Sequence, residues 1–99
     1  MIAVAETLER TCFACPSQWE GSLSDGRMFY IRYRHGTFAL RFSQEQTNDV
    51  HDAIIAPETM LMEPYDIESD GFMTDDEMMS LTQEHIDWDA IKNIDHAKK

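Results

Sequence analysis

The stretch WEGSLSDGRMFYIRYRHGTFALRF, residues 19–42, decides the predicted fold. Its three runs alternate apolar and polar residues and are separated by glycine-containing turns, which is the pattern of antiparallel strands. A two-residue turn at positions 35–36 would align the apolar residues of the second and third strands on one face. The predicted pairs are Tyr33 with Phe38, Ile31 with Leu40, and Phe29 with Phe42.

The connection between the first two strands allows two registers. A two-residue turn at Asp25-Gly26 would place Trp19 opposite Arg32, on the polar side of the second strand. A three-residue loop at 24–26, with Gly26 in a bulge, instead pairs Trp19 with Ile31 and keeps one apolar face, so we prefer it. In this register Gly21 pairs with Phe29. The reverse face then carries Glu20, Tyr30, Arg32, Arg34 and Arg41.

Residues 43–99 are predicted to be mainly helical. A short helix containing Val50 should end before Pro57, and a connecting segment follows between Pro57 and Pro64. Thr74 and Glu77 match a helix capping box, and a last helix is predicted from Asp87 or Asp89 through Trp88, Ile91 and Ile94. The predicted fold class is therefore α+β in a single domain, 1–99: a three-stranded antiparallel β-meander, about 19–42, packed by two or three short helices from the acidic half, 43–99.

The charges are distributed unequally along the chain. The 99 residues include 19 acidic and 8 basic ones, for a net charge of −11. Residues 1–42 have a net charge of +1 and residues 43–99 a net charge of −12, with no base between Arg41 and Lys92. Such a surface repels nucleic acid phosphates and anionic lipid, so we expect neither direct nucleic acid binding nor membrane binding. Basic protein surfaces are the expected partners.

The cysteine content and hydropathy predict a cytoplasmic protein. Two cysteines, Cys12 and Cys15, are too few for a disulfide framework. No apolar stretch approaches the length of about 18 residues that a membrane-spanning helix needs. If the chain is encoded by a phage, the compartment would be the cytoplasm of the host cell.

Two motifs suggest metal binding. The segment DIESDGFMTDDE, residues 66–77, fits the calcium loop of an EF-hand, with oxygen ligands expected from Asp66, Glu68, Asp70, Phe72 and Glu77. Pro64 interrupts the entering helix that this motif requires, so the alternative is a glycine turn followed by a capped helix. Cys12 and Cys15 form half a zinc site without a second half at ligand spacing. The prediction is therefore no cofactor, with calcium and zinc kept as alternatives.

No enzymatic motif is present, and the chain is predicted not to be an enzyme. It lacks a GxSxG nucleophile, a glycine-rich phosphate loop with lysine and an HExxH metal motif. The methionines of the acidic half have two interpretations, either core filler, which we favour, or an adaptable surface through which a small adaptor binds a partner. They are Met60, Met62, Met73, Met78 and Met79.

The acidic half suggests a protein inhibitor whose carboxylates imitate the charges of a nucleic acid backbone. A basic groove built to bind phosphates also attracts a fixed array of carboxylates. Ordinary solubilising surfaces mix both signs of charge, whereas this segment does not. The predicted partner-binding residues are Asp66, Glu68, Asp70, Asp75, Asp76 and Glu77, flanked by Glu58, Glu63, Glu84, Asp87 and Asp89.

The segments CPSQWEGSLSDGRMFYIRYRHGTFALRF and DGFMTDDEMMSLT, with IDW near the C-terminus, resemble small proteins encoded by bacteriophages and prophages. The resemblance spans about two thirds of the chain, judged by the sheet and capped-helix patterns. It implies an accessory phage protein, for which inhibition of a host defence such as a CRISPR effector is a common role among small acidic members. We therefore expect an anti-CRISPR type of inhibitor whose partner is a subunit of such an effector.

Overall fold

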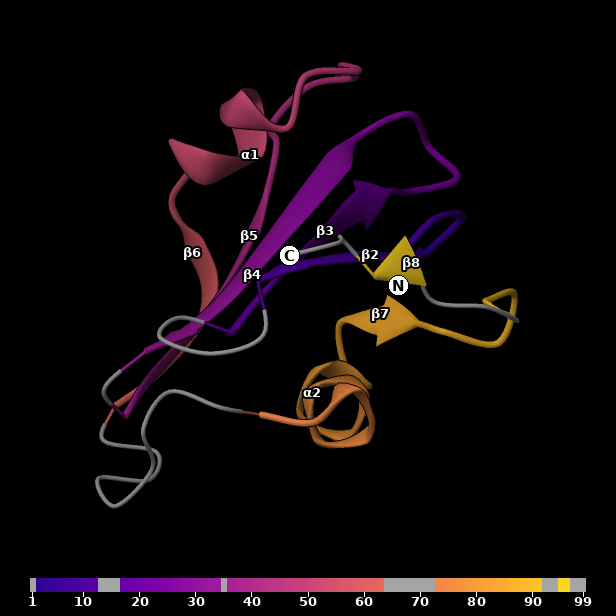
Figure 1. The fold of residues 1–99 in the computed structure, drawn as a ribbon. Helices are drawn as coiled ribbons and strands as arrows, with labels where there is room; N and C mark the ends of the chain where they lie inside the picture. The colour runs from indigo at the N-terminus through magenta and orange to yellow at the C-terminus, as the bar shows by residue number, and fades with distance from the viewer. Residues whose placement is uncertain (1, 13–16, 35, 64–72, 92–94, 97–99) are drawn as a thin grey trace.

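The computed structural model describes residues 2–12, 17–34, 36–63, 73–91 and 95–96, and these form an α+β fold (Figure 1). The main sheet has the strand order β6-β5-β4-β3-β2-β8, and a second sheet pairs β1 with β7. Strands β2 to β6 are antiparallel to their neighbours, whereas β8 is parallel to β2. The elements are β1 (Ala3–Val4), β2 (Glu9–Cys12), β3 (Ser17–Ser22), β4 (Met28–Arg34), β5 (Thr37–Phe42), α1 (His51–Ile54), β6 (Glu58–Met62), α2 (Asp75–Thr82), β7 (Ile86–Asp87) and β8 (Asp95–His96).

The predicted meander is confirmed in strands β3, β4 and β5. All three predicted pairs between β4 and β5 are present, and Trp19 lies opposite Ile31 in β3 and β4. Gly26 has a φ of 91°, and the Leu23 amide donates to the Arg27 carbonyl across the loop at 2.8 Å. The three-residue loop with Gly26 in a left-handed conformation is therefore the correct connection.

The sheet is larger than the predicted meander. Strand β2 pairs with β3, and β6 pairs with β5, so each open edge of the meander gains a further antiparallel strand. Residues 58–62 were expected to be a connecting segment between two prolines. These residues form a strand because they pair with the backbone N–H and C=O groups at the edge of β5. The local sequence ETMLM gives no sign of this pairing.

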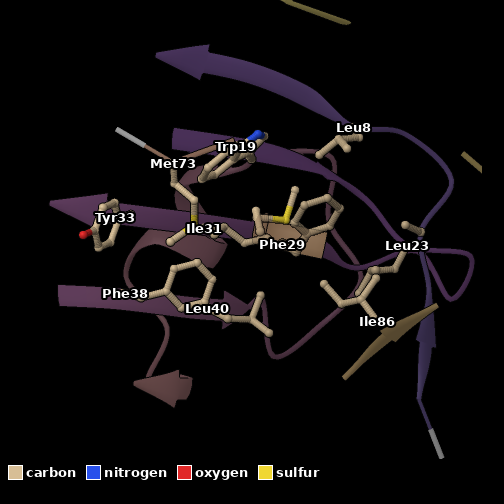
Figure 2. Packing of buried hydrophobic residues seen from close by; sticks show 12 residues of the cluster. Leu8, Trp19, Leu23, Phe29, Ile31, Tyr33, Phe38, Leu40, Met73 and Ile86 are labelled. Atoms are coloured by element: carbon tan, nitrogen blue, oxygen red, sulfur yellow. The ribbon is translucent and has the colours of Figure 1, made fainter. Parts of the chain in front are cut away.

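The apolar face of the sheet is covered by α2 and by Met73, two residues before this helix. Thr74 caps α2, since its side chain accepts the Glu77 amide at 3.1 Å, which confirms the predicted capping. Met73 and Met78 are completely buried in the core, so the core-filler interpretation is correct for these two methionines. The cluster contains Ala5, Leu8, Trp19, Leu23, Phe29, Ile31, Tyr33, Phe38, Leu40, Met73, Met78 and Ile86 (Figure 2).

Helix α1 is a single turn of four residues that begins after Val50, and it contacts strands β4 and β5. It lies on the side of the sheet away from α2 (Figure 1). Ile54 of this helix lines a hollow with Tyr30 and Arg32, which belong to the reverse face of β4. Helix α1 therefore packs on the reverse face of the sheet and not on its apolar face.

The predicted last helix is wrong for residues 87–91, and its last predicted member, Ile94, lies outside the described residues. Residues 86–87 form β7, and the Ala3 and Ala5 amides donate to the carbonyls of His85 and Asp87. The spacing of Trp88 and Ile91 reflects a single turn, in which the Ile91 amide donates to the Trp88 carbonyl at 2.9 Å. Pairing of residues 85–87 with the N-terminal strand satisfies backbone groups that a helix would have used.

Candidate functional site

A buried arginine joins the N-terminal half of the chain to the start of α2. Arg10 is 2% exposed, and its guanidinium lies 4.6 Å from the centroid of the Trp19 ring. Asp75 accepts hydrogen bonds from Arg10 Nη1 at 2.9 Å and from Trp19 Nε1 at 2.7 Å. Arg10 Nη2 also donates to the Met73 carbonyl. Asp75 therefore holds α2 against the sheet, a role that its place in an acidic run did not reveal.

The remaining described acids of α2, of β7 and of the turns on either side of β7 form the acidic surface: Asp76, Glu77, Glu84, Asp87 and Asp89. All are exposed except Asp87, which is half-buried and accepts the Asp89 amide through Oδ1 at 2.9 Å. Asp76 and Glu77 lie in the first turn of α2, where the helix dipole favours negative charge. Among the described residues, no salt bridge is formed by Asp76, Glu84, Asp87 or Asp89.

A hollow of about 460 Å³ with both apolar and polar lining residues adjoins this acidic surface. Asp87 and Asp89 form part of its lining, together with Ile2, Met79 and Trp88. Ile2 is 45% exposed, and the Trp88 indole is held by a hydrogen bond from Nε1 to the Thr82 hydroxyl at 3.0 Å. The surface therefore offers carboxylates beside an apolar contact region.

Of the other predicted partner-binding residues, Glu58 and Glu63 lie in or next to strand β6, and the rest lie outside the described residues. Glu63 is exposed just after β6, where its carboxylate accepts the Thr37 hydroxyl at 3.3 Å. Glu58 lies in β6 and is ion-paired with Arg41 at 3.1 Å, away from α2. Asp66, Glu68 and Asp70 lie outside the described residues, so their predicted role stays a prediction.

The metal-binding hypotheses concern residues that are only partly described. Phe72 lies outside the described residues, as do the three acids at the start of the predicted calcium loop, and Glu77 lies in α2. The last described element before this segment is strand β6, not the entering helix of an EF-hand. Cys12 lies in β2, whereas Cys15 is not described. Within the described part of the chain, no three potential ligands gather in a metal-binding group.

The reverse face of the main sheet carries a second polar surface. We define the open face by Tyr30, Arg32, Arg34 and Arg41. One row of paired residues crosses five strands in the order Glu9, Glu20, Tyr30, Arg41 and Glu58. Tyr30 and Arg41 of the open face therefore have carboxylates on both sides.

A hollow of about 480 Å³ lies on the open face. Arg41 contributes to its lining, but its guanidinium already donates to the Ala56 carbonyl and to Glu58. Arg32 and Arg34 are exposed, and neither forms a salt bridge within the described ranges. The hollow is lined by Tyr30, Arg32, Arg34, Thr37, Ala39, Arg41, Ile54, Glu58 and Leu61.

Partial burial changes the titration of two groups on this face. Burial raises the pKa of the Tyr30 hydroxyl, and the nearby Arg32 guanidinium opposes that shift. Burial also raises the pKa of Glu20, and repulsion by Glu9 adds to the effect. The Tyr30 hydroxyl therefore lies near the positive charges of Arg32 and Arg41.

Comparisons of the chain with protein-family models, with curated proteins and with solved structures find no match. In the described part of the chain, neither helix has the length and apolar character needed to cross a membrane. Functional inference therefore depends on the two surfaces described above.

Proposed function

We propose that this protein is a phage-encoded inhibitor of the anti-CRISPR type, which binds a nucleic-acid-binding subunit of a host defence effector. The acidic surface would occupy the basic groove of that subunit and act without catalysis. The observation that carries the proposal is the position of Asp76, Glu84 and Asp89, exposed on a fixed helix and the turns that follow it. The resemblance to small phage proteins supports the choice of target class.

Physical chemistry favours a basic partner for this surface. A groove lined by lysine and arginine has a positive potential that speeds the approach of an acidic protein and rejects partners of like charge. The sequence has no lysine or arginine from residue 42 to residue 91, so no permanently positive side chain in this part of the chain offsets the field of the carboxylates. Binding of this kind weakens steeply as salt increases.

The apolar side chains in the hollow beside Asp87 and Asp89 give the proposed interface an anchor. Charged rims mainly set the rate of association and the specificity, whereas buried aromatic and aliphatic contacts supply most of the affinity. Trp88 and Met79 are half-buried there, and Ile2 is exposed. A partner would therefore place an apolar side chain in the hollow and basic side chains against its acidic edge.

The test is capture of the partner from host lysate, followed by competition with DNA. We expect a protein with a basic groove, displaced by DNA and released by salt. The variant D76K/E84K should weaken binding roughly tenfold or more through charge repulsion. E9K/E45K is the matched control, because it reverses two exposed acids elsewhere and changes the net charge equally. Equal loss in both variants, or a partner without a basic groove, would refute the proposal.

A calcium-binding role is tested separately by thermal melting. A ligand that binds only the folded state raises the melting temperature, and the stabilisation grows with the logarithm of its concentration above the dissociation constant. The inhibitor proposal expects no shift at millimolar calcium, and a large shift would favour calcium binding by residues 66–77. The adaptor alternative, with binding through a methionine-rich surface, instead predicts association that persists at high salt.

A further inference from the structure

We propose that the hollow on the open face is a second binding site, for a small organic anion. The ligand class is a carboxylate or a phosphate monoester attached to an apolar or aromatic group. The site is separate from the acidic surface, and the inference does not depend on the proposed inhibitor function. It follows from three features of the hollow: available positive charge, an apolar lining and limited size.

The positive charge comes from Arg32 and Arg34. They occupy alternate positions of β4, so both side chains leave the same face, about 7 Å apart along the strand. Both line the hollow, and both lack a salt bridge among the described residues. A guanidinium pairs with carboxylate or phosphate through two parallel hydrogen bonds, and this geometry makes arginine well suited to such groups.

The apolar lining comes from three different elements. Ile54 of α1 is 38% exposed and Leu61 of β6 is 49% exposed, and Ala39 of β5 completes the lining with them. The half-buried Tyr30 ring lies in the same hollow, and its hydroxyl can donate or accept a hydrogen bond. An apolar or aromatic group of a ligand would cover these side chains and exclude water from the ion pair.

The size and the surrounding charge exclude a long polyanion. A hollow of about 480 Å³ is within the range of small-molecule sites, roughly 300–1,000 Å³. Glu58 lies at its edge, and Glu20 and Glu9 continue the row beyond Tyr30. A nucleic acid strand would meet these carboxylates as soon as it extended past the two arginines. A ligand with one anionic group avoids that repulsion.

The test is an NMR titration of the intact ¹⁵N-labelled protein with three probes: phenyl phosphate, 4-phenylbutyrate and inorganic phosphate. Saturable shifts are expected in β4, α1 and β6 with at least one organic anion, and inorganic phosphate should bind at least about tenfold more weakly because it lacks an apolar group. The stronger of the two organic probes identifies phosphate or carboxylate as the preferred group.

Variants assign the binding to the two arginines. Arg32→Gln and Arg34→Gln should each weaken binding of the organic probe about tenfold, because each removes a charge-assisted contact. Arg27→Gln is the matched control, since Arg27 is a partly exposed arginine paired with Asp25 at 2.7 Å and is absent from the hollow's lining. Leu61→Ser should weaken the binding of the organic probe but not the binding of inorganic phosphate. D76K/E84K should bind the probe normally even if the inhibitor proposal fails.

Three results would overturn the proposal. The first is the absence of saturable shifts with both organic anions at millimolar concentration. The second is an equal loss of affinity in Arg27→Gln and Arg32→Gln, which would indicate a general charge effect. The third is inorganic phosphate binding as tightly as the organic anions, which would leave the apolar lining without a role.

Discussion

The two faces of strand β4 differ in solvent exposure: the residues that face the core are buried, and the residues between them in the sequence are exposed or half-buried. Phe29, Ile31 and Tyr33 are almost completely buried against α2 and the segment before it, whereas Arg32 and Arg34 are exposed on the other face. Side chains on a strand alternate between faces, so one seven-residue strand supplies both a core and an open surface. The covered face therefore determines stability, and the open face is available for binding.

The largest expected effect is Phe29→Ala on the covered face. Phe29 is completely buried and contacts Trp88 edge-to-face, with ring centroids 5.5 Å apart. Loss of the ring should lower the free energy of unfolding by about 3–5 kcal/mol, measured by urea denaturation. The neighbouring Tyr30→Ala, on the open face, should cost only about 1 kcal/mol. Similar losses in the two variants would disprove the division between the faces.

The second effect tests the link between the covered face and α2. Asp75→Ala removes the carboxylate that pairs with the buried Arg10, and should cost about 3 kcal/mol. Its matched control is the exposed Asp76→Ala, which should cost less than about 1 kcal/mol through the helix dipole. The measurement is again urea denaturation. If Asp75→Ala is as mild as Asp76→Ala, the buried network does not hold α2 to the sheet.

A smaller effect is expected at the N-terminus of α2. Thr74→Ala removes the acceptor of the Glu77 amide and should cost about 1 kcal/mol of stability. Thr74→Ser keeps the hydroxyl and should restore most of it. Circular dichroism during thermal unfolding measures both variants. An unchanged melting temperature in Thr74→Ala would show that the Thr74 cap does not stabilise α2, which packs on the core.

The smallest effect concerns Glu20 on the open face, whose pKa is raised first by burial and then by repulsion from Glu9. The pKa of Glu20 in the folded state exceeds its ordinary value of 4.5. Between 4.5 and the folded pKa, the folded state therefore binds more protons than the unfolded state, and the free energy of unfolding falls as pH rises through this range. Glu20→Gln should therefore be stabilising at pH 7 by a fraction of a kcal/mol, and neutral near pH 4. Urea midpoints at both pH values test the sign, and a stabilisation larger at pH 4 would contradict it.

The sequence predicted the central meander because its signals are local. Alternation along β4 and β5 and the glycine turns determine the register without knowledge of distant residues. Strands β2 and β6 were missed because their conformation depends on pairing with the edges of that meander. The last helix was predicted wrongly because a single turn at Trp88 resembles the start of a helical repeat, while residues 86–87 pair with a strand at the other end of the chain.

The candidate sites were only partly predictable for a related reason. Composition alone identified the acidic half, and alternation identified the arginines of the open face. The role of Asp75 could be recognised only from its contact with Arg10, 65 residues away in the sequence. The sequence around Arg10 does not indicate that this side chain is buried. The hollow on the open face likewise needs Ile54 and Leu61, which come from elements that the sequence did not place there.

The most direct test of the proposed function is hydrogen–deuterium exchange of the protein bound to its captured partner. The account predicts new protection in α2 and β7, around Asp76, Glu84 and Asp89, with exchange in β4 and β6 unchanged. Protection confined to β4 and β6, with α2 and β7 unaffected, would contradict the assignment of partner binding to the acidic surface.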